Sequence, residues 1–144
     1  MTVEQRVRLL KALLRLGGVV TASGFAAIFL PQDWMASSHV WLGLGEFPRA
    51  PIVGYLARSI AALYGFHGVL LLIVARDPLA LRPMVSYVAF VNVAFGAIKF
   101  GIDLYSGMPP WWTLGEGPPI AALGMVIGWL NSSIPAAASR SAHV

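Results

Sequence analysis

Four apolar segments alternate with short polar connections along the chain. They cover residues of about 12–30, 53–75, 83–105 and 118–134, and each approaches the roughly 20 residues that a helix needs to cross a bilayer. Prolines, glycines and charged residues separate the segments. The pattern therefore predicts an all-α fold, a four-transmembrane-helix bundle.

The start of the first helix carries a local signal. Thr2-Val3-Glu4-Gln5 fits a capping box, so the first helix is expected over about 3–30. A cleavable signal peptide is the alternative, with "ASS" at 36–38 as the cleavage site. The long charged region before the apolar run favours a retained anchor.

The connection between the second and third segments is short. Arg76-Asp77-Pro78 ends one helix, and Pro83 suits the first position of the next. These two helices are therefore expected to be antiparallel neighbours. The chain as a whole, 1–144, is expected to form a single membrane domain with a frayed tail over 135–144.

The amino-acid composition indicates whether the chain is surrounded by water or by lipid. Hydrophobic residues make up 58% and charged residues 11%, against about 45–50% and about 25% in ordinary soluble domains. These values indicate an integral membrane protein in contact with lipid and exclude nucleic-acid binding. The chain has no cysteine, which excludes disulfides, thiolate metal sites and thiol catalysis.

Basic residues concentrate on one side of the predicted bundle. The positive-inside rule places that side, with both termini, in the cytoplasm, and the loops 31–52 and 106–117 outside. In a bacterium this is the inner membrane. The residues on the basic side are Arg6, Arg8, Lys11, Arg15, Arg76, Arg82 and Arg140, against Arg49 on the other.

Four of the five tryptophans lie in the two predicted outer loops, a placement typical of the headgroup layer. One of these loops contains "DWMASSHVWLGL" at 33–44. This stretch predicts a short interfacial helix that is capped by Asp33 and turns Trp34, Trp41 and Leu42 to lipid.

The third segment carries a polar stripe. Asn92, Lys99 and Asp103 fall within about 40° of one another on a helix. Ionised groups in hydrocarbon need a partner. Arg58 on the second segment lies at a similar depth, so the sequence predicts an ion pair of Arg58 with Asp103, with Lys99 beside the same carboxylate.

Further charged residues of the outer loops are expected to join this cluster. Two interpretations follow. The charges pair to fix the helix register, or they form an outward-open pocket for a lipid headgroup, a quinone or a small acid. The loop residues concerned are His39, Glu46, Arg49 and Glu116.

His67 lies near mid-membrane on the second segment, with Tyr64 one turn away. A neutral imidazole bonded to a neighbouring helix, at Asn92 or a hydroxyl, is the structural interpretation, and a ligand or proton-relay role is the alternative. His39 is expected about 20 Å higher, which argues against a bis-histidine haem. We expect no cofactor, metal site or catalytic template.

The fourth segment contains a GxxxG motif at Gly124 and Gly128, which permits close helix approach. The contact is either within the bundle or with a second copy or another membrane subunit.

The layout loosely resembles small bacterial four-helix membrane proteins of the DoxX-like kind and related uncharacterised families. The residues that carry the resemblance are "GLGEFPRAPIVGYLARSIAALYGFHG" and "GIDLYSGMPPWWTLGEGPP". It brings no assigned activity. We therefore expect a non-enzymatic accessory or scaffold subunit; a small carrier or enzyme is the alternative.

The charge distribution makes a testable prediction about topology. Reporter fusions after Asp77 and after Val144 should report a cytoplasmic position, and a fusion within 106–117 should report the outside, because the basic residues flank the first two positions. Any reversal would contradict the orientation.

Overall fold

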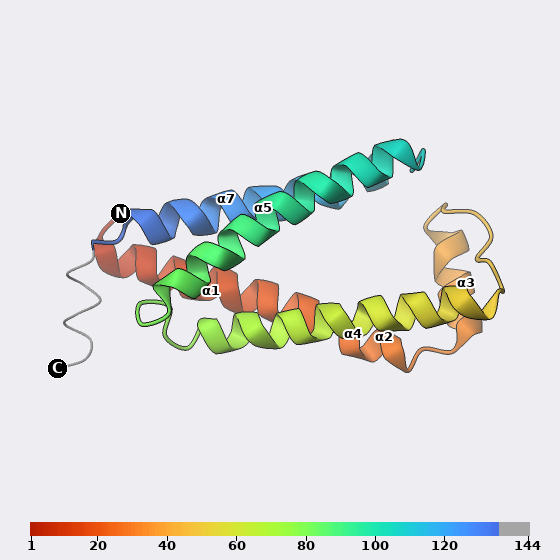
Figure 1. The fold of residues 1–144 in the computed structure, drawn as a ribbon, viewed down its shortest axis with the longest axis horizontal. Coiled ribbons are helices and arrows are strands. Elements are labelled where there is room, and N and C mark those ends of the chain that lie inside the picture. Colours follow the sequence, from red (N-terminus) through yellow and green to blue (C-terminus); the bar gives the residue numbers. More distant parts are fainter. Residues whose placement is uncertain (136–144) are drawn as a thin grey trace. The chain divides into compact units, whose positions relative to one another are not determined.

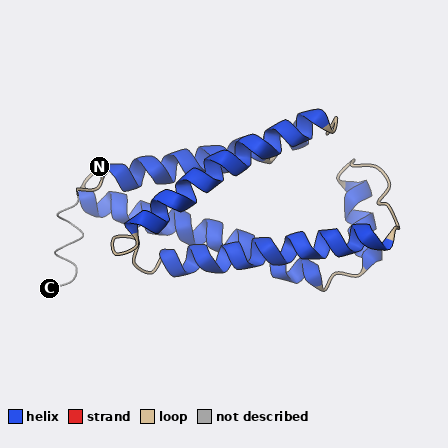
Figure 2. Cartoon of the chain, viewed as in Figure 1, coloured by secondary structure: helices blue, strands red, loops and turns tan. Residues whose placement is uncertain are grey.

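The computed structural model of the protein describes residues 1–135 of the 144. These residues form helices joined by loops and turns, without a strand (Figure 2). The all-α prediction is therefore confirmed for this part of the chain. Of the predicted frayed tail, 136–144 lies outside the described residues.

The predicted apolar segments coincide closely with the long helices. One difference concerns the first segment, which is interrupted at Ser23 and so forms two helices. The bounds are α1 (Val3–Ala22), α2 (Gly24–Ile28), α3 (Gln32–Trp41), α4 (Pro51–Val74), α5 (Arg82–Tyr105), α6 (Pro110–Gly115) and α7 (Gly117–Ser133).

Three helical stretches are long and apolar enough to cross a membrane: Val3–Ile28, Pro51–Val74 and Arg82–Tyr105. The fourth expected span, α7, has 17 residues, or about 26 Å of helix. This is shorter than the roughly 30 Å of a hydrocarbon core. By length, the structure therefore identifies three candidate crossings in residues 1–135, and the fourth stays a prediction.

The predicted capping box at the start of α1 is confirmed. The Gln5 amide donates to Thr2 Oγ1 at 3.2 Å, and the Thr2 amide donates to Gln5 Oε1 at 2.8 Å. Two amides that lack a helical partner are thereby satisfied.

The described chain packs into two compact units. One unit contains 1–16 together with the residues from Leu71 onward, and therefore α5, α6 and α7. The other unit, Gly17–Leu70, contains the end of α1, the helices α2 and α3, and most of α4.

Small residues set the packing of the unit 17–70. A Cβ placed on Gly24 of α2 would lie 3.0 Å from the Ala61 carbonyl oxygen of α4, and one on Gly65 would lie 2.5 Å from the ring of Phe25. The rings of Phe25 and Phe66 meet edge to face, 5.2 Å between centroids. These glycines therefore let α2 lie directly against α4.

Glycines also bring α5 and α7 together in the other unit, where the two helices run antiparallel and side by side (Figure 1). A Cβ on Gly124 would lie 2.7 Å from the Ala89 carbonyl oxygen, and one on Gly96 would lie 2.5 Å from the Gly117 carbonyl oxygen. Gly124 of the GxxxG motif is thus used within the chain. A contact with a second copy or another subunit stays a prediction and needs a different surface.

Arginines satisfy the last carbonyls of α7. Arg82 Nη2 donates to the carbonyl oxygens of Asn131 at 2.6 Å and Ile134 at 2.8 Å. Arg6 Nη1 donates to that of Ser133 at 2.6 Å. Because a helix leaves its last carbonyls without internal partners, these guanidinium groups join the starts of α1 and α5 to the end of α7.

A helix is present in the predicted stretch, as α3, and Figure 1 shows it running across the direction of α4. Its position at a membrane interface stays a prediction. Trp41, which is 84% exposed, and Trp34 both lie on its surface. The predicted cap is wrong: Pro31 precedes the helix, no side chain caps it, and Asp33 lies inside the first turn. The proline fixes the backbone direction at this helix start without a polar cap.

The two glycines of the GxxxG motif differ in a way that can be tested. Gly124→Ala should lower the stability in detergent by roughly 1–3 kcal/mol, because the added carbon meets the backbone of α5. Gly128→Ala is the matched control, since its Cβ would lie 3.4 Å from that of Ala89. Thermal unfolding of both variants is the measurement, and equal losses would contradict the packing.

Candidate functional site

Lys99 lies between two carboxylates in the unit that contains α5, α6 and α7. Its Nζ is 3.6 Å from Asp103 Oδ1 and 3.1 Å from Glu116 Oε2. The structure therefore brings together three of the residues that the sequence predicted as an ion-pair cluster.

Burial distinguishes the two carboxylates. Asp103 is 2% exposed, and its Oδ2 has no hydrogen-bond partner. The side chains of Lys99 and Glu116 remain 23% and 24% exposed. A buried carboxylate oxygen without a donor is unfavourable, so Asp103 is the strained member of the cluster.

The polar stripe of α5 faces into the protein, as its spacing predicts. Asn92 and Asp103 are buried, and so is Gly96 between them. Asn92 lies where α7 passes closely, because a Cβ on Gly124 would be 2.9 Å from the Cβ of Asn92. The stripe therefore lines the α5–α7 contact rather than a lipid face.

The corner between α5 and α7 positions Glu116. The turn after α5 uses Gly107, whose φ of 65° favours glycine, and the Met108 amide donates to the Asp103 carbonyl oxygen at 2.9 Å. Thr113 is buried, and its hydroxyl donates to the Met108 carbonyl oxygen at 3.4 Å. Since the next residue, Gly117, contacts Gly96, Glu116 is brought to the Lys99 side of α5.

An aromatic pair adjoins this carboxylate. Trp112 Nε1 donates to Glu116 Oε2 at 2.8 Å, and the rings of Trp111 and Trp112 lie 5.5 Å apart at 80°. A surface hollow of about 270 Å³ is lined by these two rings together with Gly115 and Glu116.

Arg58 has partners other than the carboxylate that the sequence predicted. Its Nε donates to the Ile28 carbonyl oxygen and its Nη2 to that of Leu30, each at 3.0 Å. A weaker bond joins Nη1 to the Gly54 carbonyl oxygen at 3.3 Å. Arg58 thereby caps the end of α2, whose last carbonyls lack helical partners, and its pairing with Asp103 stays a prediction.

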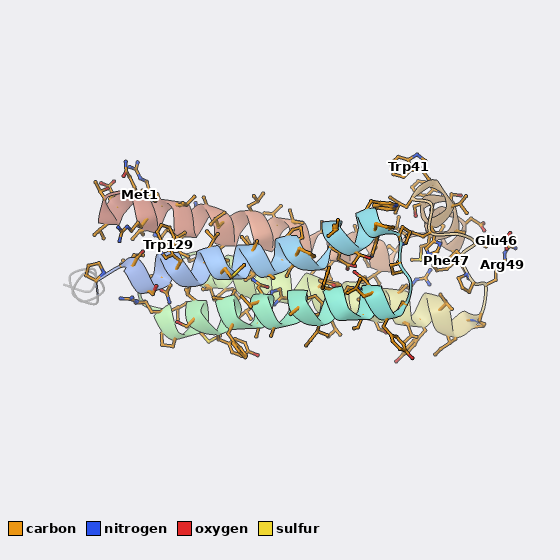
Figure 3. The ribbon with its side chains drawn as sticks, turned by 90° about the horizontal axis from the view of Figure 1, so that it is seen from above. Met1, Trp41, Glu46, Phe47, Arg49 and Trp129 are labelled. Atoms are coloured by element: carbon orange, nitrogen blue, oxygen red, sulfur yellow. The ribbon has the colours of Figure 1, made fainter. Side chains whose placement is uncertain are left out.

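Three outer-loop residues of the predicted cluster, His39, Glu46 and Arg49, lie in the unit 17–70. His39 Nδ1 is hydrogen-bonded to the Gly45 carbonyl oxygen at 3.0 Å, and its ring contacts Phe47. Glu46 and Arg49 are exposed on the loop before α4 (Figure 3). Within residues 1–135, the structure gives neither of these two an ion pair.

His67 and Tyr64 lie one turn apart on α4, and both are partly buried. The backbone of α2 passes next to Tyr64, since a Cβ on Gly24 would be 3.2 Å from the Tyr64 Cβ. A hydrogen bond from His67 to a neighbouring helix stays a prediction, and so does a proton-relay role.

No group of three or more histidine, aspartate or glutamate side chains is arranged to hold a metal ion in residues 1–135. The cluster around Lys99 offers two carboxylates that already bind an ammonium.

Two features of the site were not found from the sequence. The hydrogen bond of Trp112 to Glu116 joins residues four apart, a spacing that could have indicated it. The capping of α7 by Arg6 and Arg82 joins residues far apart in the chain, and no local pattern predicts it.

No protein-family model matches the chain, and comparisons with curated proteins and with solved structures find no match.

A double-mutant cycle tests the cluster. Lys99→Met should destabilise the protein by up to about 3–5 kcal/mol, because it leaves the buried Asp103 carboxylate without its cation. Asp103→Asn should cost less, since Lys99 keeps Glu116. The double variant should recover part of the first loss.

Thermal unfolding in detergent measures each member of this cycle. Arg8→Met is the control, because Arg8 and Glu4 form an exposed pair that should contribute little. Purely additive losses would show that Lys99 and Asp103 do not stabilise each other.

Proposed function

We propose that this chain is a non-enzymatic accessory or scaffold subunit of a membrane assembly, in a bacterial inner membrane. One observation carries the proposal. Three charged side chains of its helices, Arg58, Arg82 and Lys99, contact the chain itself, where they satisfy helix ends or form ion pairs.

The contacts of these charged groups support a structural role. Arg58 donates to the carbonyl oxygens that follow α2, and Arg82 donates to those at the end of α7. Lys99 contacts two carboxylates. Each charge therefore holds two elements of the fold together, as intramembrane charges do when they specify packing.

Exposed apolar side chains on the helices support contact with lipid or with the helices of another subunit. Phe66 of α4 is 67% exposed and Phe90 of α5 is 70% exposed, and Trp129 of α7 lies on the surface (Figure 3). Faces of this kind are accommodated by lipid tails or by the helices of a partner subunit.

The proposed topology has four crossings with both termini in the cytoplasm. The proposal includes a fourth passage through α7, which is apolar and runs antiparallel beside α5. This layout loosely resembles that of the small DoxX-like membrane proteins mentioned above.

The alternative is a carrier or enzyme with an outward-open pocket for a lipid, quinone or small acid. It assigns Arg58, Lys99 and Asp103 to the pocket wall. The guanidinium of Arg58 already donates to three carbonyl oxygens, which makes it a poor anion site and disfavours this alternative.

Purification from native membranes in a mild detergent tests the role. Mass spectrometry should find other membrane subunits at a fixed stoichiometric ratio to this chain, and a harsh detergent that disperses helix contacts should remove them. A chain that purifies alone and itself retains a quinone or small acid would contradict the accessory role and favour the carrier.

A further inference from the structure

The hollow at the corner of α6 and α7 combines two features that serve different purposes in most proteins. Its walls include two indole rings, Trp111 and Trp112, and its edge includes the carboxylate of Glu116. Apolar anchoring in a headgroup layer needs the rings alone. The carboxylate beside them contacts Lys99 and also places a negative charge at the edge of the hollow.

Both indole rings line the hollow. They meet edge to face, with centroids 5.5 Å apart and planes at 80°. Cations bind over an indole face within about 6 Å of its centroid. The hydrogen bond from Trp112 Nε1 to Glu116 holds one of these rings against the carboxylate.

The local charge also favours a cation. Between residues 96 and 120 the chain carries Lys99, Asp103 and Glu116 as its charged groups, and these form one contiguous cluster. One ammonium against two carboxylates leaves a formal charge of −1.

The buried Asp103 strengthens this argument. Its Oδ2 is enclosed and lacks a hydrogen-bond partner, and Lys99 lies closer to Glu116 than to Asp103. The cluster therefore carries one formal negative charge more than its single ammonium neutralises, and Glu116 presents the cluster at the edge of the hollow.

We propose that this hollow binds a monovalent organic ammonium group, of the kind carried by choline or ethanolamine. Its volume of about 270 Å³ accommodates such a group. The ammonium lies against the indole faces with Glu116 as its counter-charge. The ligand is either the headgroup of a zwitterionic phospholipid or a free amine, and it is recognised by the same contacts in both cases. This site does not depend on the accessory role proposed above.

Gly115 provides a variant that blocks the hollow without changing any charge. It lines the hollow, and a Cβ placed on it meets no atom within 4 Å, so Gly115→Leu should fold and fill the space. Gly101→Leu is the matched control, because Gly101 also has open space at its Cβ and does not line the hollow. Trp111→Leu removes one wall as a second, independent variant.

Native mass spectrometry of the purified full chain measures binding. The probes are phosphatidylcholine, phosphatidylethanolamine and phosphatidylglycerol with identical acyl chains, added separately in detergent, and choline chloride in a parallel titration. The two zwitterionic lipids should be retained in preference to the anionic phosphatidylglycerol. Gly115→Leu and Trp111→Leu should each weaken this retention about tenfold, and Gly101→Leu should leave it unchanged.

Retention of phosphatidylcholine without choline binding would identify the lipid headgroup as the source, and choline binding alone would identify a free amine. Equal retention of the anionic lipid, or retention that neither Gly115→Leu nor Trp111→Leu weakens, would overturn the proposal and leave the tryptophans as interfacial anchors. If Gly115→Leu does not fold, as judged by its helical circular dichroism, Trp111→Leu decides the outcome.

Discussion

The fold of this chain depends on hydrogen bonds to the backbone carbonyl oxygens at its helix ends. A helix leaves its last carbonyls without internal partners, and hydrocarbon offers no water to replace them. Both units meet this demand in the same way. Arg58 donates to the carbonyls of Ile28 and Leu30 at the end of α2, and Arg82 donates to those of Asn131 and Ile134 at the end of α7.

Arginine suits this task because of its geometry. Its planar guanidinium carries five N–H donors in a fixed fork, so one side chain can reach carbonyl oxygens that diverge at a helix end. The bond is also charge-assisted and opposes the negative end of the helix dipole. The charge of each arginine is thereby used for connecting helices, which is why these residues lie inside an otherwise apolar chain.

The sequence predicted the positions of the long helices well, because each apolar segment that forms one is continuous along the chain. It also predicted the capping box of Thr2 and the inward face of the α5 stripe, which both depend on residue spacing alone. The partner of Arg58 was missed for a physical reason. The carbonyl oxygens that Arg58 contacts are available because the first segment breaks at Ser23 and its second helix, α2, ends at Ile28. The sequence does not reveal this break, because the apolar segment could equally continue as one helix.

The cluster at Lys99 shows how backbone packing can govern a charged site. Gly96 and Gly117 meet so closely that a Cβ on Gly117 would lie 2.6 Å from the Gly96 carbonyl oxygen, and this contact fixes where Glu116 enters. Lys99 then lies nearer Glu116 than Asp103. If the charges alone decided the geometry, the most buried carboxylate would hold the ammonium most closely, since pairing is worth most where water is excluded. The glycine contact therefore limits where the Glu116 carboxylate can lie, and Lys99 pairs with both carboxylates within that limit.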